Sequence, residues 1–282
     1  MIKFTQAERT QKPARIGILG QTASGKTISS LLLAKGLTGA GKVVIFDTEN
    51  GRASLKANNP LLEDWSFDTY TVEPDKASPT LALDVAKEAV SQGYQAIIFD
   101  STSHLWDWTL NEKERLGQAW RYWAKAKAPY YKFIREAVIN LPIHTILTLR
   151  TEMKYEQEEN SGKKEVVKLG LTPQGEKNLQ YELDFVFNID RNHEAVIEKA
   201  EDGVFSSESF IITPETGQDI KNWLSMGKDY DPEARTKASY INRISELYIQ
   251  KHEVETLPDE ELAKLKSMSV AELTAYGLSF KK

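Results

Sequence analysis

The sequence of 282 residues contains no cysteine and only four histidines. The absence of cysteine excludes a disulfide scaffold, a thiolate-zinc site and a cysteine nucleophile, and four scattered histidines offer little for a transition-metal site. Long apolar runs are also missing: the longest, such as residues 43–46 and 96–99, have four residues, whereas a membrane span needs about 20. The first residues lack the hydrophobic region of a signal peptide. The sequence therefore predicts a cytoplasmic protein with no membrane partner.

An excess of positive charge is absent as well. Lys and Arg number 36 against 41 Asp and Glu, which gives a formal net charge of -5. A protein that coats nucleic acid over its whole surface would usually be basic. Because salt confines such fields to about 10 Å, a local basic patch remains compatible with this balance. Any binding of DNA or RNA is therefore expected to come from a patch.

Short apolar strands alternate with helical patterns in the first 150 residues. Fully apolar runs of this length are typical of strands buried on both faces of a parallel sheet, and the intervening segments repeat apolar residues at helical spacing. This alternation predicts an α/β fold with a doubly wound, mostly parallel sheet. The expected strands are residues 15–19, 43–46, 96–99 and 143–149, and the expected helices are 27–37, 80–92 and 109–140, the last with a break near Pro129.

The pattern changes after residue 150. Residues 152–168 are strongly polar, with turn chemistry at residues 160–162 between two extended flanks. Further strands are expected at 183–189, 195–198 and 210–213, followed by a charged helical tail with a break at Pro258. The sequence thus predicts antiparallel additions to the sheet and a small helical C-terminal extension. The expected domains are an N-terminal arm over 1–14, a core over 15–225 and the extension over 226–282.

Residues 20–27 fit the pattern G-x-x-x-x-G-K-[ST], between an expected strand and an expected helix. In such a phosphate loop the backbone N–H groups converge on phosphate oxygens, and the helix N-terminus adds partial positive charge. Lys26 is expected to reach the β- and γ-phosphates, and Thr27 is expected to bind Mg²⁺. The sequence therefore predicts a nucleotide site formed by Gly20, Gln21, Thr22, Ala23, Ser24, Gly25, Lys26, Thr27 and Ile28.

Two further strands end in acidic residues. Asp100 follows the strand 96–99, at the edge where the phosphate loop also opens, so we expect it to hold Mg²⁺ together with Thr27. Many P-loop ATPases place a glutamate directly after this aspartate, but Ser101 stands there. The strand 43–46 runs into Asp47-Thr48-Glu49. Glu49 is expected to orient the attacking water, with Asp47 on the same face if the strand continues extended; the alternative makes both of them solvated loop residues.

These motifs together resemble the RecA-like ATPase core. RecA-family recombinases keep their catalytic glutamate after the second strand rather than beside the magnesium aspartate. The details of residues 46–51 (FDTENG) and 99–101 (FDS) look most like the short RecA-like proteins of bacteriophages, some of which belong to the Sak group of single-strand annealing recombinases. The resemblance covers about residues 14–213. It implies a RecA-like fold, ATP as the nucleotide, self-association with ATP at subunit boundaries and, for a phage protein, the host cytoplasm.

The same resemblance implies two further catalytic residues. Arg150 ends the strand 143–149, where RecA-like cores keep a polar sensor of the γ-phosphate. Lys199 follows the strand 195–198, from which RecA-like proteins reach a basic residue into the ATP of the neighbouring subunit. There it would stabilise transition-state charge in trans. In the alternative interpretation both are solvated residues at strand ends.

Two segments are candidates for single-stranded DNA. Residues 111–135 hold seven cations against two glutamates, interleaved with Trp and Tyr. Cations follow a phosphate backbone and aromatic rings stack on bases, although the same pattern is typical of an amphipathic helix that buries its aromatic residues. In RecA-like proteins the loops after the third and fourth core strands face the DNA, and the slightly acidic segment 152–168 corresponds to such a loop here. In the alternative interpretation this segment is an exposed edge hairpin whose charges prevent aggregation. The candidate contacts are Arg121, Lys125, Lys127, Lys163 and Lys164.

The leading hypothesis is a Mg·ATP-dependent ATPase of DNA recombination or single-strand annealing. Its expected partners are single-stranded DNA and further copies of itself. The C-terminal extension is expected to be a packed tail, with contacts to a single-strand-binding protein as the alternative. The first alternative is an assembly or loader ATPase that acts on another protein. The acidic charge balance favours this alternative, whereas Ser101 in place of a glutamate disfavours a loader of the AAA+ type. A P-loop kinase is the second alternative, although no segment clusters arginines as a kinase lid does.

Overall fold

The computed structural model describes residues 6–160, 163–228, 234–252, 254 and 256–280. The chain forms two compact units, Met1–Lys228 and Asp229–Lys282. No helix in these described ranges is long and apolar enough to cross a membrane.

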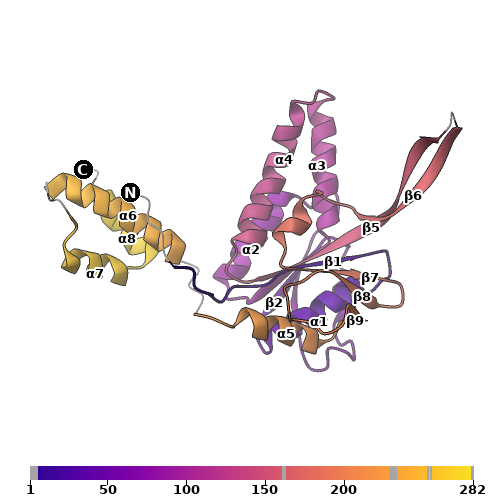
Figure 1. The fold of residues 1–282 in the computed structure, drawn as a ribbon, viewed down its shortest axis with the longest axis horizontal. Helices are drawn as coiled ribbons and strands as arrows, with labels where there is room; N and C mark the ends of the chain where they lie inside the picture. Colours follow the sequence, from indigo (N-terminus) through magenta and orange to yellow (C-terminus); the bar gives the residue numbers. More distant parts are fainter. Residues whose placement is uncertain (1–5, 161–162, 229–233, 253, 255, 281–282) are drawn as a thin grey trace. The chain divides into compact units, whose positions relative to one another are not determined.

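The first unit is built on one nine-stranded sheet (Figure 1). Its strands follow the order β3-β2-β4-β5-β1-β7-β8-β9, and β6 pairs with β5 off this path. The strands from β3 to β7 in this order pair in parallel, whereas β8, β9 and β6 are antiparallel. The strands are β1 (Arg15–Gly20), β2 (Val43–Asp47), β3 (Asp68–Thr71), β4 (Ala96–Asp100), β5 (His144–Asn160), β6 (Lys163–Pro173), β7 (Phe185–Ile189), β8 (Glu194–Lys199) and β9 (Ser209–Ile211).

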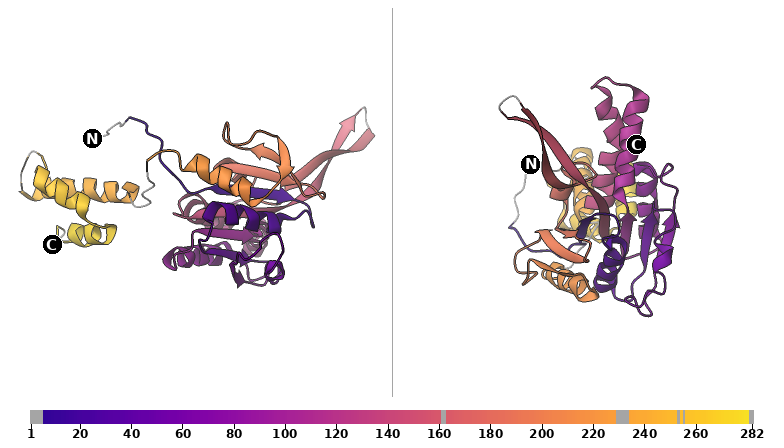
Figure 2. Two further views of the ribbon diagram at one scale, coloured as in Figure 1. Left: turned by 90° about the horizontal axis from the view of Figure 1, so that it is seen from below. Right: turned by 90° about the vertical axis from the view of Figure 1, so that its right-hand side faces the viewer.

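Helices cover both faces of this sheet, as Figures 1 and 2 show. On one face, α1 (Lys26–Thr38) packs against α5 (Pro214–Leu224). Their contact requires glycine, because a Cβ on Gly36 would meet the carbonyl oxygen of Pro214, and one on Gly217 would meet that of Leu33. The other face carries α2 (Pro79–Ser91), α3 (Thr102–Leu116), α4 (Tyr122–Phe133) and the π-helix η2 (Ile134–Ile139). Two short 3-10 helices, η1 (Ser54–Lys56) and η3 (Leu179–Glu182), lie in connecting segments.

The described residues of the second unit form three helices, α6 (Ala234–His252), α7 (Asp259–Ser267) and α8 (Val270–Leu278). They bury a small core of Ile244, Leu265 and Leu273. Pro258 stands immediately before α7, where the sequence predicts a break. The expected α/β class is therefore confirmed: a mostly parallel sheet with antiparallel additions and a small set of C-terminal helices.

The expected break near Pro129 is wrong. α3 ends at Leu116, followed by Gly117 at φ 118°, and α4 continues through Pro129. A proline inside a helix costs about 3 kcal/mol. Here Tyr130 and Phe133, which follow it in the same helix, are fully buried. Their burial outweighs the lost backbone hydrogen bond, and glycine, which tolerates positive φ, provides the break instead.

Two features of the strands differ from the sequence pattern. β3 was not expected, because it lies at the sheet edge with all four residues exposed and therefore has no apolar signal. β5 does not stop at the core but runs on to Asn160 and forms a long hairpin with β6 (Figure 1). The expected turn residues Ser161 and Gly162 lie outside the described residues.

Candidate nucleotide site

The register of the parallel strands brings the expected site residues to one edge of the sheet. Asp47 at the end of β2 is the partner of Asp100 at the end of β4. Gly20 at the end of β1 is the partner of Arg150 in β5 and of Ile189 in β7. Segments that are far apart in the sequence thus meet at the phosphate loop.

A cavity of ≈ 720 Å³ opens at this edge. The phosphate loop and the start of α1 form one wall, the segment after β2 forms a second, and the turn between β9 and α5 forms a third. Asn192 and His193, from the turn between β7 and β8, complete it. The lining side chains include Thr22, Ala23, Lys26, Thr27, Ile28, Glu49, Arg52, Leu55, Asp100, Arg150, Ile212 and Pro214.

The phosphate loop is shaped by its glycines and by Lys26. Gly25 adopts φ 94° immediately before α1, and a Cβ on Gly20 would collide with the hydroxyl of Ser24. The amine of Lys26 donates hydrogen bonds of 2.9 Å to the carbonyl oxygens of Gly20 and Gln21. Burial lowers the pKa of Lys26, while Asp100 and Glu49 act in the opposite direction. Ser24 Oγ is buried without a hydrogen-bond partner among the described residues, so the loop retains an unused polar group for phosphate.

Thr27 and Asp100, the two residues expected to hold Mg²⁺, contact each other. Thr27 Oγ1 donates to Asp100 Oδ2 at 2.6 Å, and Thr148 Oγ1 from β5 donates to Asp100 Oδ1 at 2.5 Å. Burial raises the pKa of Asp100, and the two threonine hydrogen bonds oppose that rise. Mg²⁺ commonly keeps several waters and takes one or two protein ligands besides phosphate. Thr27 Oγ1 and the Asp100 carboxylate are two such oxygen donors side by side. Among the described residues there is no group of three His, Asp or Glu side chains that could hold a metal ion.

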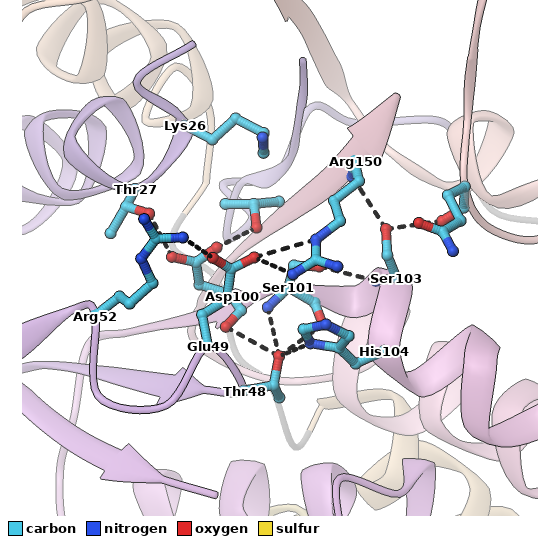
Figure 3. Close-up of polar contacts among 12 residues, drawn as sticks. Lys26, Thr27, Thr48, Glu49, Arg52, Asp100, Ser101, Ser103, His104 and Arg150 are labelled. Atoms are coloured by element: carbon cyan, nitrogen blue, oxygen red, sulfur yellow. Dashed lines mark hydrogen bonds and ion pairs between the residues drawn. The ribbon is translucent and has the colours of Figure 1, made fainter. Parts of the chain in front are cut away.

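Glu49 lies between two arginines (Figure 3). Its Oε1 accepts hydrogen bonds from Arg150 Nη2 at 2.8 Å and Arg150 Nε at 3.2 Å. Its Oε2 pairs with Arg52 Nη1 at 3.6 Å. Burial acts to raise the pKa of Glu49, but the hydrogen bond and charge of Arg150 outweigh it, and the pKa is lowered. The carboxylate is therefore ionised and faces the same cavity as Lys26.

Asp47 does not share this face. β2 ends at Asp47, and its carboxylate turns inward to accept the backbone N–H groups of Glu49 at 2.6 Å and Ala53 at 2.9 Å. The expectation that Asp47 and Glu49 project together fails because the strand does not continue extended. Asp47 is fully buried and instead fixes the turn that presents Glu49 and Arg52.

Thr48 and His104 connect the ends of β2 and β4 in a way that the sequence did not reveal. Thr48 Oγ1 accepts the backbone N–H of Ser101 at 2.8 Å and lies 2.6 Å from His104 Nδ1. Burial lowers the pKa of His104, and the charge of Arg150 lowers it further. A lone threonine between two acids carries no pattern that would have identified it.

The backbone of Arg150 is held by a second set of contacts. Its N–H donates to Ser103 Oγ at 3.0 Å, and the Ser103 hydroxyl donates to the carbonyl oxygen of Gln174 at 2.8 Å. Gln174 N donates to the carbonyl of Arg150 at 2.7 Å, and its side chain donates to Asp107 at 2.9 Å. Arg150 is thus fixed where β5 leaves the main sheet and enters the hairpin.

The turn between β7 and β8 contacts the phosphate loop, which sequence reasoning missed. His193, at φ 68°, places Nδ1 2.9 Å from the carbonyl oxygen of Ser24. Because a carbonyl only accepts, Nδ1 carries the proton. Arg191 Nε donates to Gln21 Oε1 at 3.1 Å. The only available signal was the turn chemistry of Asp190 and Asn192.

Lys199 is not brought to the cavity of its own chain. Lys199 pairs with Val186 near the start of β7, whereas Ile189 is the last residue of that strand. The amine of Lys199 donates to the carbonyl oxygens of Tyr181 at 3.1 Å and Gln180 at 3.5 Å.

The expected nucleic-acid residues fall into three environments. Arg121 and Lys125 are exposed at the start of α4, beside Trp120, which is 84% exposed. Lys127 instead donates to Glu176 at 2.8 Å and lies over the rings of Trp106 and Trp123. The helix therefore buries some of its aromatic residues and exposes others. Lys163 and Lys164 occupy β6 opposite Asn160 and Glu159; their side chains lie outside the described part of the chain.

Comparisons with known proteins extend this picture. Among solved structures, the chain is similar to the crystal structure of the RadB recombinase, with 19% sequence identity and a TM-score of 0.42 over 78% of this chain and 93% of that one. Among curated proteins, no match was found. Residues 12–222 match the family described as the AAA domain, a range that includes the phosphate loop, Glu49, Asp100 and Arg150. The chain belongs to this AAA domain family.

Proposed function

We propose that the protein is a Mg·ATP-dependent ATPase that acts in DNA recombination or single-strand annealing. One observation carries the ATPase part: the ionised carboxylate of Glu49 faces the same cavity as Lys26, Thr27 and Asp100. The resemblance to the short RecA-like proteins of bacteriophages, including the Sak group, is part of this proposal and rests on residues 46–51 and 99–101.

Hydrolysis assigns a task to each of these groups. A water attacks the γ-phosphorus, the bond from that phosphorus to the β–γ bridging oxygen breaks, and ADP leaves. Glu49 orients the water and accepts its hydrogen bond, for which an ionised carboxylate is required. Lys26 and the loop N–H groups stabilise the charge on the phosphate oxygens. Thr27 and Asp100 would hold Mg²⁺, which supplies further neutralisation of that charge when bound.

Self-association of this protein would place ATP at a boundary between subunits. Large apolar side chains are exposed at the cavity: Leu55 is 78% exposed, Leu61 60% and Ile211 65%. Exposed apolar clusters of this kind mark interaction surfaces. A second copy of the chain would cover them, and Lys199 of that copy is the candidate group acting in trans.

Single-stranded DNA is the proposed polymer partner. The support comes from Trp120, Arg121 and Lys125, which combine an exposed aromatic ring with two exposed cations. Lys163 and Lys164 in the hairpin remain candidates. Lys127 contributes less, because Glu176 already neutralises it.

An assembly or loader ATPase that acts on another protein is the second candidate. Two observations favour it: the match to the AAA domain family and the net charge of -5. Ser101 in place of a glutamate was expected to disfavour an AAA+ type loader, yet the chain belongs to the AAA domain family with Ser101 in that position. A kinase is the weakest alternative.

Steady-state ATP hydrolysis with Mg²⁺, measured with and without single-stranded DNA, tests the proposal. We expect DNA to stimulate hydrolysis by the wild type, and Glu49→Gln to reduce the rate by about 10²–10⁴-fold, the usual loss when a general base is removed. Glu246→Gln, an exposed acid in α6, is the matched control and should behave as the wild type. A hydrolysis rate that does not change with DNA but rises with a protein partner would favour the second candidate. Full activity of Glu49→Gln would show that Glu49 has no part in the mechanism.

A further inference from the structure

Arg52 is a charged residue of the cavity to which the hydrolysis described above gives no task. It follows Glu49 by three residues in the tight turn that Asp47 organises, and its side chain is 66% exposed. It nevertheless lines the cavity that contains Lys26 and Thr27. Figure 3 shows its guanidinium on the opposite side of the Glu49 carboxylate from Arg150.

The two arginines contact different oxygens of the Glu49 carboxylate. Arg150 binds Oε1 at 2.8 Å, and Arg52 pairs with Oε2 at 3.6 Å. Guanidinium groups recognise carboxylate and phosphate by the same planar arrangement of donors. The carboxylate of Glu49 therefore occupies a position that is also suited to a phosphate group.

We infer that Arg52 and Arg150 form a clamp for the γ-phosphate of the bound nucleoside triphosphate, and that Glu49 occupies this clamp until the triphosphate displaces it. The inference rests on the proposed ATPase function. It adds a catalytic contact, Arg52, and it couples arrival of the third phosphate to release of Glu49. Only after that release is the carboxylate free to orient water.

The charges at the site agree with an anionic occupant. Four cations line the cavity, Lys26, Arg52, Lys56 and Arg150, against the two carboxylates of Glu49 and Asp100. A third phosphate would replace the carboxylate at both guanidinium groups, so the displacement leaves neither arginine unpaired. ADP lacks the phosphate that reaches this position, and the clamp would therefore distinguish ATP from ADP.

An ordinary surface ion pair provides the contrast. Arg243 and Glu246 in α6 have the same three-residue spacing, with a distance of 3.1 Å and exposed fractions of 69% and 65%. Such exposed pairs contribute about 0–1 kcal/mol and have no further role. The Arg52 pair differs because Glu49 is only 17% exposed, is shared with a second arginine and lies on the cavity wall.

The experiment measures equilibrium binding of ADP and of a non-hydrolysable ATP analogue, each with Mg²⁺, to the full chain. For Arg52→Ala we expect binding of the analogue to weaken about tenfold or more, with ADP binding unchanged within about twofold. Arg52→Lys keeps the charge but loses the fork, so it should fall between Arg52→Ala and the wild type. Glu49→Gln should bind the analogue more tightly, because a neutral amide competes less for the arginines. Arg243→Ala is the matched control and should equal the wild type.

Two outcomes would overturn the clamp. An equal loss for ADP and the analogue would make Arg52 a support of the turn, and no loss for either would make it a surface residue. Lys26→Ala separates this failure from that of the proposed function. If the wild type binds neither nucleotide, or Lys26→Ala binds both as the wild type does, the ATPase proposal fails and the clamp fails with it.

Discussion

The two ends of the parallel sheet both hold buried charge, but they hold it differently. At the amino end, Arg15 is 6% exposed, and its guanidinium donates to the backbone carbonyl oxygens of Ile139, Leu141 and Ile143. Beside it, His144 Nδ1 accepts the backbone N–H of Ala14 at 3.0 Å. Each of these partners is a backbone group.

At the carboxyl end, charged side chains bind one another and face a cavity. Glu49 is shared by Arg52 and Arg150, and Lys26 rests on carbonyl oxygens of its own loop. A ligand that offers an anion can reach these groups from the cavity, whereas Arg15 does not line it. Lys26 and Arg15 are similarly buried and both donate to backbone carbonyl oxygens, but only Lys26 lines the cavity. Access from the cavity, more than the depth of burial, therefore separates a charge that serves chemistry from one that serves stability.

Arg15→Met is expected to have the largest effect and to act on stability. The substitution keeps an apolar stem but removes the donor from the buried carbonyl oxygens of Leu141 and Ile143, each at about 1–3 kcal/mol, and from the partly buried one of Ile139. The free energy of unfolding of the first unit should fall by roughly 5 kcal/mol. Urea unfolding followed by circular dichroism measures it. If the loss is below about 1 kcal/mol, the amino end of the sheet is not the structural end that the comparison makes it.

Lys26→Ala should act in the opposite way, on chemistry and not on stability. Loss of its donor to the phosphates should reduce the rate of ATP hydrolysis by about 10²–10³-fold, equivalent to about 3–4 kcal/mol of transition-state stabilisation. The unfolding free energy should not fall, because burial already disfavours the charged amine and lowers its pKa. Steady-state hydrolysis and urea unfolding on the same preparation test both parts. Destabilisation as large as that of Arg15→Met would contradict the contrast between the two ends.

His144 gives the amino end a dependence on pH. Burial, with the charges of Arg15 and Lys221, lowers its pKa from 6.5 to about 4. The unfolded chain therefore binds a proton between about pH 6.5 and pH 4 that the folded chain does not. Stability is complete above pH 6.5 and should fall by about 3 kcal/mol as the pH drops to 4, at 1.36 kcal/mol per unit.

Urea unfolding at a series of pH values measures this slope. The matched variant is His144→Asn, whose side-chain oxygen can accept the N–H of Ala14 without titrating. Its curve should lack the part of the slope that His144 contributes. An identical slope in the wild type and the variant would show that other groups cause the acid sensitivity.

The sequence was most informative where function depends on neighbouring residues. The phosphate loop is contiguous, so its glycines, Lys26 and Thr27 form a recognisable pattern. Asp100 was found because a strand buried on both faces has an apolar signature that ends at a definite residue. The fold class followed from the same alternation of strands and helices, whereas exposed β3 had no such signature.

The rest of the site depends on contacts that no local pattern encodes. The bond between Arg150 and Glu49 joins residues 101 positions apart, and that between Thr48 and His104 joins residues 56 apart. The direction of the Asp47 side chain depended on where β2 ends, which periodicity does not fix to one residue. Arg52 was missed because a single arginine in a polar loop resembles any solvated residue until the turn brings it to the cavity.

Ser103→Ala is expected to have the smallest effect. It tests whether the catalytic position of Arg150 depends on a hydrogen bond to its backbone. The hydroxyl accepts the N–H of Arg150 and donates to the carbonyl oxygen of Gln174, so it positions Arg150 without touching the cavity. Its loss should cost about 1 kcal/mol of stability and lower kcat about tenfold with little change in KM, because Arg150 would be misplaced for the transition state more than for binding. Ser103→Thr should restore the rate, and Ser245→Ala, a serine of α6 bonded to Ile241, should leave it unchanged. If Ser103→Ala loses stability but keeps its kcat, the ion pair with Glu49 is sufficient to position Arg150. Catalysis would then not depend on the hydrogen bond between Ser103 and the backbone of β5.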